Sequence, residues 1–292
     1  MNNKITSWAL FVLLSFIWGS SFILMKEGLL HLTAFQVASL RIVSSGFVLI
    51  PIAVKAFQKI PYKKWSIVFL SGSLGSLLPA YLFCMAEQGI DSSLAGTLNS
   101  LTPIFTIITG VLFFKTIPST QKIIGILLAF SGCIVMYFSQ SKLQVDQNVW
   151  FVFYVILATF FYGLNVNLVH HHLKEYASLE IVGLALFLNA IPALIVLCFS
   201  GFFSLDFHDN GVLASIGFTV FLGILGTSIA SILFYKLIKS AGAVFSSMVT
   251  YGIPFVAILW GFIYKEKIGS MQLFSLLIIL SGVYVANKKR LS

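Results

Sequence analysis

Apolar residues dominate ten long stretches of the chain, and short polar or charged segments separate them. A helix needs about 20 apolar residues to cross roughly 30 Å of hydrocarbon at a rise of about 1.5 Å per residue. The stretches are close to this length, so the pattern predicts an all-α integral membrane protein with ten transmembrane helices and short connections. The predicted spans cover residues 6–25, 34–54, 66–86, 93–114, 122–139, 149–169, 179–200, 212–235, 243–264 and 269–287.

The composition agrees with this prediction. Hydrophobic residues make up 59% of the 292 residues and charged residues only 9%, which is too few to coat a soluble protein of this size. We therefore expect membrane lipid to cover most of the outer surface. The formal net charge is +9, but the basic residues lie in short gaps between the apolar stretches and form no patch, so nucleic acid is not expected as a partner.

The distribution of lysine and arginine predicts the orientation of the spans. Thirteen basic residues flank the spans on the side of the N-terminus and four lie on the opposite side, while Arg41 falls inside the second span. Because positive residues are retained in the cytoplasm, both termini are predicted to be cytoplasmic, in a multi-pass protein of the cytoplasmic (inner) membrane. Glu27 and Glu87 fall at outer helix ends, where we expect them to mark the boundary with water; the alternative is that they sense protons.

The sequence also contains an internal repeat. An offset of 151 residues aligns the third and fourth predicted spans with the eighth and ninth without a gap. An offset of 144 pairs the first span with the sixth. The repeat predicts two five-helix halves, residues 1–144 and 145–292. The matched residues include Gly72 with Gly223, Gly75 with Gly226, Pro103 with Pro254, and Trp18 with Tyr162.

An odd number of spans per half has a consequence for topology. The second half must enter the membrane from the opposite face, so the two halves are predicted to be inverted copies. Inverted repeats are common in secondary transporters, because two similar units with exchanged conformations give outward-open and inward-open states of similar energy. The alternative is an old gene duplication that is retained only for packing.

Two strings of residues resemble a known family. LSFIWGSSFILMK (14–26) and the long segment from LFYKLIKSAG to SGVYVAN (233–287) are similar to EamA-type exporters of the drug/metabolite transporter superfamily. The resemblance extends over nearly the whole chain and implies export of amino acids or related small metabolites. One departure concerns a glutamate that the family pattern places at a helix junction: Glu266 is present in the second half, whereas the first half has Lys115 at that position.

Polar residues inside the spans predict where a substrate binds. Such side chains are costly against lipid and usually face the bundle interior or a wet cavity. Spans four and nine each carry them just before a proline, which removes a backbone hydrogen bond and frees a carbonyl. We interpret the prolines as kinks that help gating, although a kink that serves only packing would look the same. The residues are Asn99 and Thr102 before Pro103, and Thr250 and Tyr251 before Pro254.

Four further spans add substrate-binding candidates, each of which is equally able to bridge two helices. These residues are Trp18 and Ser21 in span one, Tyr162 and Asn165 in span six, Tyr81 in span three and Ser228 in span eight.

Arg41 is the one charged residue well inside a predicted span, and an intramembrane ionisable residue is a functional candidate by default. Its guanidinium group fits a substrate carboxylate or phosphate in a bidentate manner. The alternative is a side chain that reaches the outer interface.

No chemistry beyond transport is indicated by the motifs. The sequence has no nucleotide-binding glycine loop, no convincing Ser/His pair and no Cys/His cluster, so we expect no cofactor, no metal and no enzymatic activity. The predicted function is an exporter or facilitator of small molecules that works by alternating access about a central cavity, with a monomer able to enclose that cavity. The alternatives are a channel and an intramembrane enzyme that acts on lipid-linked substrates.

Overall fold

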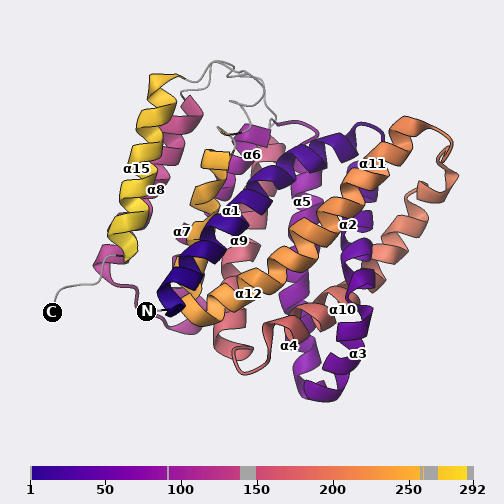
Figure 1. The fold of residues 1–292 in the computed structure, drawn as a ribbon, viewed down its shortest axis with the longest axis horizontal. Helices are drawn as coiled ribbons and strands as arrows, with labels where there is room; N and C mark the ends of the chain where they lie inside the picture. The colour runs from indigo at the N-terminus through magenta and orange to yellow at the C-terminus, as the bar shows by residue number, and fades with distance from the viewer. Residues whose placement is uncertain (1, 91, 139–148, 257–258, 260–268, 288–292) are drawn as a thin grey trace.

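A computed structural model describes residues 2–90, 92–138, 149–256, 259 and 269–287, and this part of the chain is helical with short connections and no strand (Figure 1). The α-helices are α1 (Asn2–Leu29), α2 (Ala34–Val48), α3 (Ile50–Lys59), α4 (Trp65–Gly72), α5 (Leu78–Ala86), α6 (Ser92–Asn99), α7 (Thr102–Phe114), α8 (Thr120–Phe138), α9 (Val149–His172), α10 (Ser178–Phe199), α11 (Asn210–Phe221), α12 (Ala230–Ala241), α13 (Ala243–Ser247) and α15 (Ser270–Asn287).

Six helical segments of the described chain are long and apolar enough to cross a membrane: Lys4–Leu29, Tyr62–Ala86, Ala95–Phe114, Val149–His172, Ser178–Phe199 and Asn210–Ala241. A seventh predicted span, 34–54, is a pair of helices, α2 and α3, that bend by 66° at Leu49. Pro51 lies in the first turn of α3, where it has no N–H to continue the ladder of α2. Three shorter apolar helices occupy the fifth, ninth and tenth predicted positions.

The third and eighth predicted spans contain an unexpected irregularity. In each, the helix widens into a π-helical segment, η2 (Ser73–Leu77) between α4 and α5 and η4 (Leu222–Ile229) between α11 and α12. The two segments overlap when the chain is shifted by 151 residues. Such π segments are frequent at functional sites, because the extra residue in the turn redirects side chains and carbonyls.

The fourth and ninth predicted spans are interrupted just before their prolines rather than kinked at them. α6 ends at Asn99 and α7 begins at Thr102, so Pro103 lies in the first turn of the second helix. A 3₁₀ segment, η5 (Met248–Gly252), follows α13, and Pro254 lies in the helical turn after it. The expectation of a proline in a helix interior was therefore wrong, because a proline is accommodated best where its missing N–H needs no partner.

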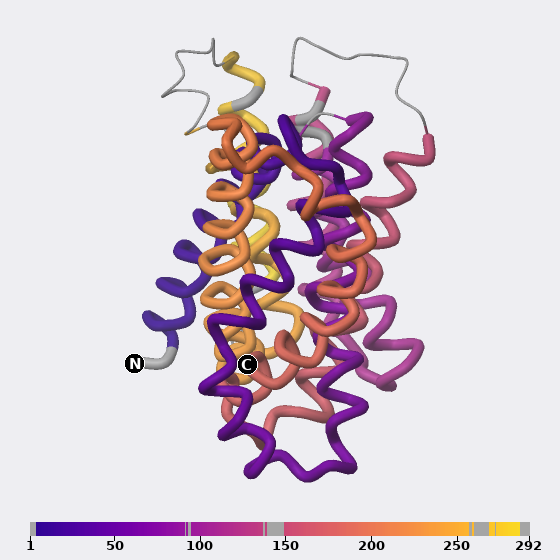
Figure 2. Tube along the Cα trace, turned by 90° about the vertical axis from the view of Figure 1, so that its right-hand side faces the viewer, coloured from indigo at the N-terminus to yellow at the C-terminus, as the bar shows by residue number. Residues whose placement is uncertain are grey.

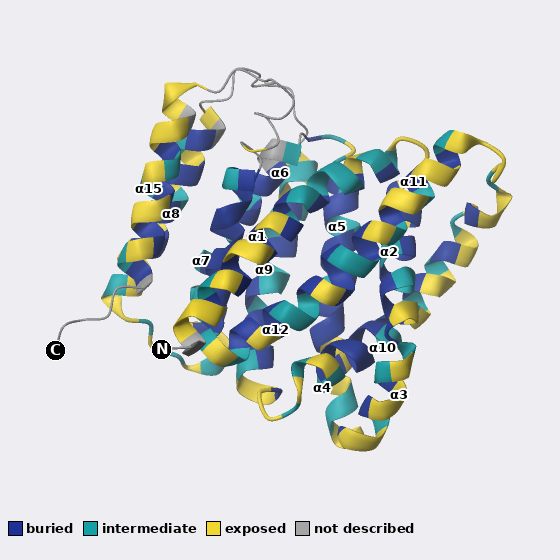
Figure 3. Cartoon of the chain, viewed as in Figure 1, coloured by how far each residue is buried: buried dark blue, intermediate teal, exposed yellow. Residues whose placement is uncertain are grey.

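Large apolar side chains cover the outside of the bundle. Phe47, Leu112, Phe199 and Leu277 are each more than 60% exposed, and exposed residues follow the length of α15 and α11 in Figure 3. An apolar surface of this extent requires lipid around it. Together with the apolar helices, it identifies a multi-pass membrane protein.

The start of α1 and the end of α15 lie at the same end of the bundle in two perpendicular views (Figures 1 and 2). The turns that join α3 to α4 and α9 to α10 also lie there. Ion pairs join these turns, Lys59 to Glu180 at 2.5 Å and Lys64 to Glu175 at 3.8 Å. Glu266 and most of the second part of the ninth predicted span lie outside the described residues.

Candidate functional site

A cavity lies at the boundary between two apolar cores. Trp18, Val166, Phe234 and Tyr235 belong to or pack on one core, while Met25, Phe83 and Tyr162 belong to or pack on the other, and all of them also line the cavity. The empty space between the lining residues is about 860 Å³, part of it open to solvent. Its lining combines aromatic and polar side chains, as in sites that bind small organic molecules.

Most of the lining consists of residues that are 144 or 151 positions apart in the chain. These pairs are Trp18 with Tyr162, Ser21 with Asn165, Phe22 with Val166, Gly75 with Gly226, Ser76 with Thr227, Phe83 with Phe234, Asn99 with Thr250, and Thr102 with Ile253. Five lining residues have no such counterpart in the lining: Met25, Arg41, Ser231, Tyr235 and Ser247. The same offsets that align the sequence with itself therefore also describe the wall of the cavity.

Aromatic contacts across the cavity follow the same relation. The Trp18 ring meets the Phe234 ring with centroids 4.9 Å apart, and the Tyr162 ring meets the Phe83 ring at 6.1 Å. Each pair joins one half of the chain to the other. Tyr162 is the counterpart of Trp18, and Phe83 is the counterpart of Phe234, so the second contact repeats the first with the two halves exchanged. The Trp18 indole also donates from Nε1 to the Gly226 carbonyl at 3.1 Å.

Close backbone approaches show the same exchange. A Cβ added to Gly226 would lie 2.9 Å from Ser21 Oγ, and one added to Gly75 would lie 2.2 Å from Asn165 Nδ2. Both positions fall in the π segments and require glycine because a side chain of the other half already occupies the space.

The same relation holds at a second matched pair of glycines, Gly72 and Gly223. A Cβ on Gly223 would meet the Arg41 carbonyl oxygen at 2.6 Å, and one on Gly72 would meet the Ala185 carbonyl oxygen at 2.8 Å. Arg41 and Ala185 are 144 positions apart, and Gly72 and Gly223 are 151 apart. The contact between the halves is therefore made twice, with the roles of the halves reversed.

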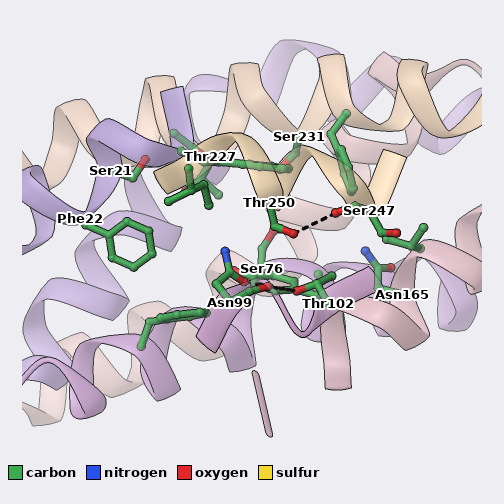
Figure 4. Close-up of a pocket in the computed structure, with 18 of the residues that line it drawn as sticks. Ser21, Phe22, Ser76, Asn99, Thr102, Asn165, Thr227, Ser231, Ser247 and Thr250 are labelled. Carbon is green, nitrogen blue, oxygen red and sulfur yellow. Dashed lines mark hydrogen bonds between the residues drawn. The ribbon is translucent and has the colours of Figure 1, made fainter. Parts of the chain in front are cut away.

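The two interrupted spans present their polar residues to the middle of the cavity, where Asn99 and Thr102 lie near Thr250 and Ser247 (Figure 4). The Thr102 hydroxyl donates to the Asn99 carbonyl at 2.8 Å, which is the carbonyl that Pro103, four residues later, leaves without an N–H donor. The Thr250 hydroxyl donates to the Ser247 carbonyl at 3.0 Å. A neighbouring hydroxyl thus satisfies the carbonyl that Pro103 frees, whereas the Thr250 carbonyl, four residues before Pro254, accepts the Ile253 N–H.

Arg41 is the one charged residue among those that line the cavity. Its Nε donates to the Thr227 hydroxyl at 2.7 Å, and within the described residues its terminal guanidinium nitrogens make no hydrogen bond. The η4 segment therefore holds the guanidinium group at one side and leaves its fork of N–H donors available. Such a fork is suited to a carboxylate.

Asn165 offers a second unfilled polar group. Its Nδ2 donates to the Tyr235 hydroxyl at 3.2 Å, and that hydroxyl also bonds to Ser71 Oγ at 2.7 Å. Its Oδ1 is buried and has no hydrogen-bond partner in the described part of the chain. A buried amide oxygen without a donor is costly, so a ligand that supplies an N–H or O–H would stabilise this wall.

Eight of the eleven predicted binding residues line the cavity: Trp18, Ser21, Arg41, Asn99, Thr102, Tyr162, Asn165 and Thr250. Three do not, and their interpretation as cavity residues is corrected. Tyr81 bonds to Ser39 at 2.6 Å, and Ser228 bonds to the Ser45 carbonyl at 3.1 Å. Tyr251 is completely buried and donates to the Ile126 carbonyl of α8 at 3.0 Å, because η5 turns its side chain toward α8.

Several lining residues were not predicted, among them Ser76, Thr227 and Ser247. Ser76 and Thr227 are 151 positions apart and follow the matched glycines Gly75 and Gly226 directly. The repeat therefore contained a signal for this pair. In the described residues, no three His, Cys, Asp or Glu side chains are grouped in a way that suits a metal ion.

Comparison with known proteins identifies relatives that are transporters. The sequence profile of the EamA-like transporter family matches residues 6–138 and again residues 149–288. An uncharacterized transporter of Archaeoglobus fulgidus is 26% identical over 97% of this chain and 99% of its own length. A protein of Salmonella typhimurium named "Probable amino-acid metabolite efflux pump" is 25% identical over 92% of this chain and 90% of its own.

The fold has also been seen before. A crystal structure of another protein superposes with a TM-score of 0.72 and 14% sequence identity, covering 96% of both chains. At that identity the likeness concerns the fold alone. The family profile, by contrast, covers nearly the whole sequence, so this chain belongs to the EamA-like transporter family of the drug/metabolite transporter superfamily.

Proposed function

We propose that the protein is a secondary transporter that exports, or facilitates the movement of, small metabolites such as amino acids through this cavity by alternating access. Family membership establishes a transporter, and the name of the Salmonella relative supports amino-acid metabolites as the substrate class. The cavity supports a small solute with a carboxylate, because its lining has one cation, a buried amide oxygen without a donor, and aromatic walls.

The observation that carries the proposal is the paired lining of the cavity. Eight pairs of lining residues are related by the two sequence offsets, and the contacts between halves occur twice in exchanged order. This supports two inverted five-helix halves, 1–144 and 145–292, and the double match of the family profile agrees with it. If the halves exchange conformations, an opening on one side becomes an opening on the other at little energetic cost.

Each predicted residue that lines the cavity has a role in this account. Arg41 binds the anionic group of the substrate, and Ser21, Asn99, Thr102, Asn165 and Thr250 bind its polar groups. Trp18 and Tyr162 pack on its apolar part. Pro103 and Pro254 begin the second part of each interrupted span, where a hinge would let that part move.

The orientation is proposed from charge. The start of α1 and the end of α15 lie at the same end of the bundle as the turns that carry Lys59 and Lys64. By the positive-inside rule this end faces the cytoplasm, with the protein in the cell membrane. One chain encloses the cavity, so a monomer is sufficient.

The proposal is tested with purified protein in liposomes. A thermal-shift screen of amino acids and related metabolites first finds a solute that raises the Tm, because a ligand that binds only the folded state stabilises it. Counterflow of the labelled solute into liposomes that contain the unlabelled solute is the expected result for a carrier. Linear uptake without counterflow would indicate a channel, and conversion of the solute would indicate an enzyme.

A further inference from the structure

Glu87 does not mark the boundary with water as its position at a helix end suggests. It follows α5 directly, and its backbone N–H bonds to the carbonyl of Phe83, a cavity residue one turn deeper. Both carboxyl oxygens are inaccessible to solvent in the described part of the chain. α5 packs against α2 and α9.

The groups around this carboxyl come from several helices. Lys26 of α1 and Arg41 of α2 both favour the carboxylate, as does the Ser92 hydroxyl at the start of α6. The Cys84 thiol lies on the same helix, and the Tyr162 phenol of α9 interacts with Cys84 and Arg41. Neither cation forms an ion pair with Glu87 in the described part of the chain. Burial outweighs them and raises the pKa of Glu87 to about 8.

Arg41 connects Glu87 to the cavity, because it acts on this carboxyl and also lines the substrate space. A ligand carboxylate that binds the free side of the guanidinium offsets its positive charge. Glu87 then loses one of the fields that favour its ionised form, and it binds a proton more tightly. By thermodynamic reciprocity, a protonated Glu87 leaves Arg41 more attractive to the ligand anion.

We propose that Glu87 is a proton-binding site coupled to anion binding at Arg41, so that a substrate carboxylate enters the cavity together with one proton from the surrounding water. The proton offsets the negative charge of the ligand carboxylate, which lowers the cost of moving that group through a low-dielectric path. The proposal deepens the proposed function and rests on it, because it takes the cavity as the substrate site.

The first test follows the proton itself and needs no substrate. Infrared difference spectra are recorded during a pH titration of the protein in lipid nanodiscs, for wild type, Glu87→Gln and the control Glu27→Gln. The protonated-carboxyl band is expected to disappear with a midpoint near pH 8 in wild type and Glu27→Gln, and to be absent from Glu87→Gln. Because glutamine mimics the neutral acid, this variant is expected to fold. A band that persists unchanged in Glu87→Gln would overturn the proposal.

The second test measures the coupling, with sodium benzoate as the probe. Benzoate binding is followed by calorimetry, and proton uptake by a pH indicator in weak buffer near pH 8. Wild type is expected to take up protons when benzoate binds, and Glu27→Gln to do the same because Glu27 does not line the cavity. Arg41→Gln is expected to lose binding, and Glu87→Gln to bind without proton uptake.

The outcomes separate the two proposals. Binding to wild type without proton uptake would overturn the proton coupling and leave the substrate site intact. Absence of benzoate binding to wild type would contradict the anion site at Arg41, and the proton coupling with it.

Discussion

The two halves of the chain build nearly the same cavity wall but differ in charge. Arg41 and Glu87 belong to the first half, and their counterparts at offsets of 144 and 151 are Ala185 and Ile238. The helices agree with this register, since α2 begins at Ala34 and α10 at Ser178. The difference teaches that a duplicated scaffold supplies the shape of the cavity, while substitutions in one copy supply its chemistry.

The largest effect is expected from removing the positive charge of Arg41, which the second half lacks at the matching position. Arg41→Gln should reduce the transport rate of the solute found by screening by about 10- to 100-fold, because a hydrogen bond to a charged group contributes about 1.5–3 kcal/mol. Thr227→Ala retains the cation and removes only the bond to Nε, so its loss should be smaller. Initial rates in liposomes measure both. Equal rates for wild type and Arg41→Gln would show that the charge difference between the two halves has no role in substrate binding.

A second comparison places one methyl group in each half. Gly75→Ala puts a carbon 2.2 Å from Asn165 Nδ2, which Tyr235 holds in place, whereas Gly226→Ala meets the ends of Ser21 and Leu222 at 2.9 Å. Overpacking of this kind costs about 1–3 kcal/mol, and we expect Gly75→Ala to lower the Tm more. Thermal unfolding in detergent measures the difference. The opposite order would mean that the first-half wall is the more adaptable one.

The pH dependence of stability tests the burial of Glu87, the second charged residue that distinguishes the first half. The pKa of Glu87 is raised from 4.5 to about 8 in the folded protein, so folding favours its protonated form. Stability from this group is complete below about pH 4.5 and is lost as the pH rises through about 8. The Tm of wild type should therefore fall over this range by a few °C more than that of Glu87→Gln. Parallel curves for the two proteins would contradict the burial of this carboxyl.

The smallest effect is expected from the neighbour of a cavity residue in the second half. Tyr251→Phe removes only the hydrogen bond to the Ile126 carbonyl, at a cost of about 1 kcal/mol in unfolding free energy, and should leave transport unchanged. Thr250→Ala should reduce transport with little change in stability, because Thr250 lines the cavity. Transport rates and Tm values are measured for both. A larger loss of transport in Tyr251→Phe than in Thr250→Ala would mean that Tyr251 belongs to the substrate site.

The sequence predicted the helical membrane fold and much of the cavity lining for one physical reason. Polar side chains such as Asn99 and Asn165 are too costly against lipid, so their presence inside an apolar run places them in the interior. The transporter family was also predicted and is confirmed by the family profile. The roles of the individual residues in binding stay predictions.

The features that were not predicted depend on which way each helix turns its side chains and on how the end of the helix packs. Tyr251 differs from Thr250 by one position, and only the path of η5 decides which of them faces the cavity. The π segments that present Ser76 and Thr227 leave no periodic signal in an apolar run. Glu87 looks like a boundary residue until neighbouring helices are seen to cover its carboxyl group.

Access to one matched pair of cavity positions tests the central claim most directly. Ser76→Cys and Thr227→Cys are made separately in a chain without Cys84, Cys133 and Cys198, and a membrane-impermeant thiol reagent is applied to right-side-out and to inside-out vesicles. Alternating access about a shared cavity predicts that each cysteine reacts from both faces and that the transported solute slows both reactions. Reaction of either cysteine from one face only, unaffected by the solute, would contradict the account.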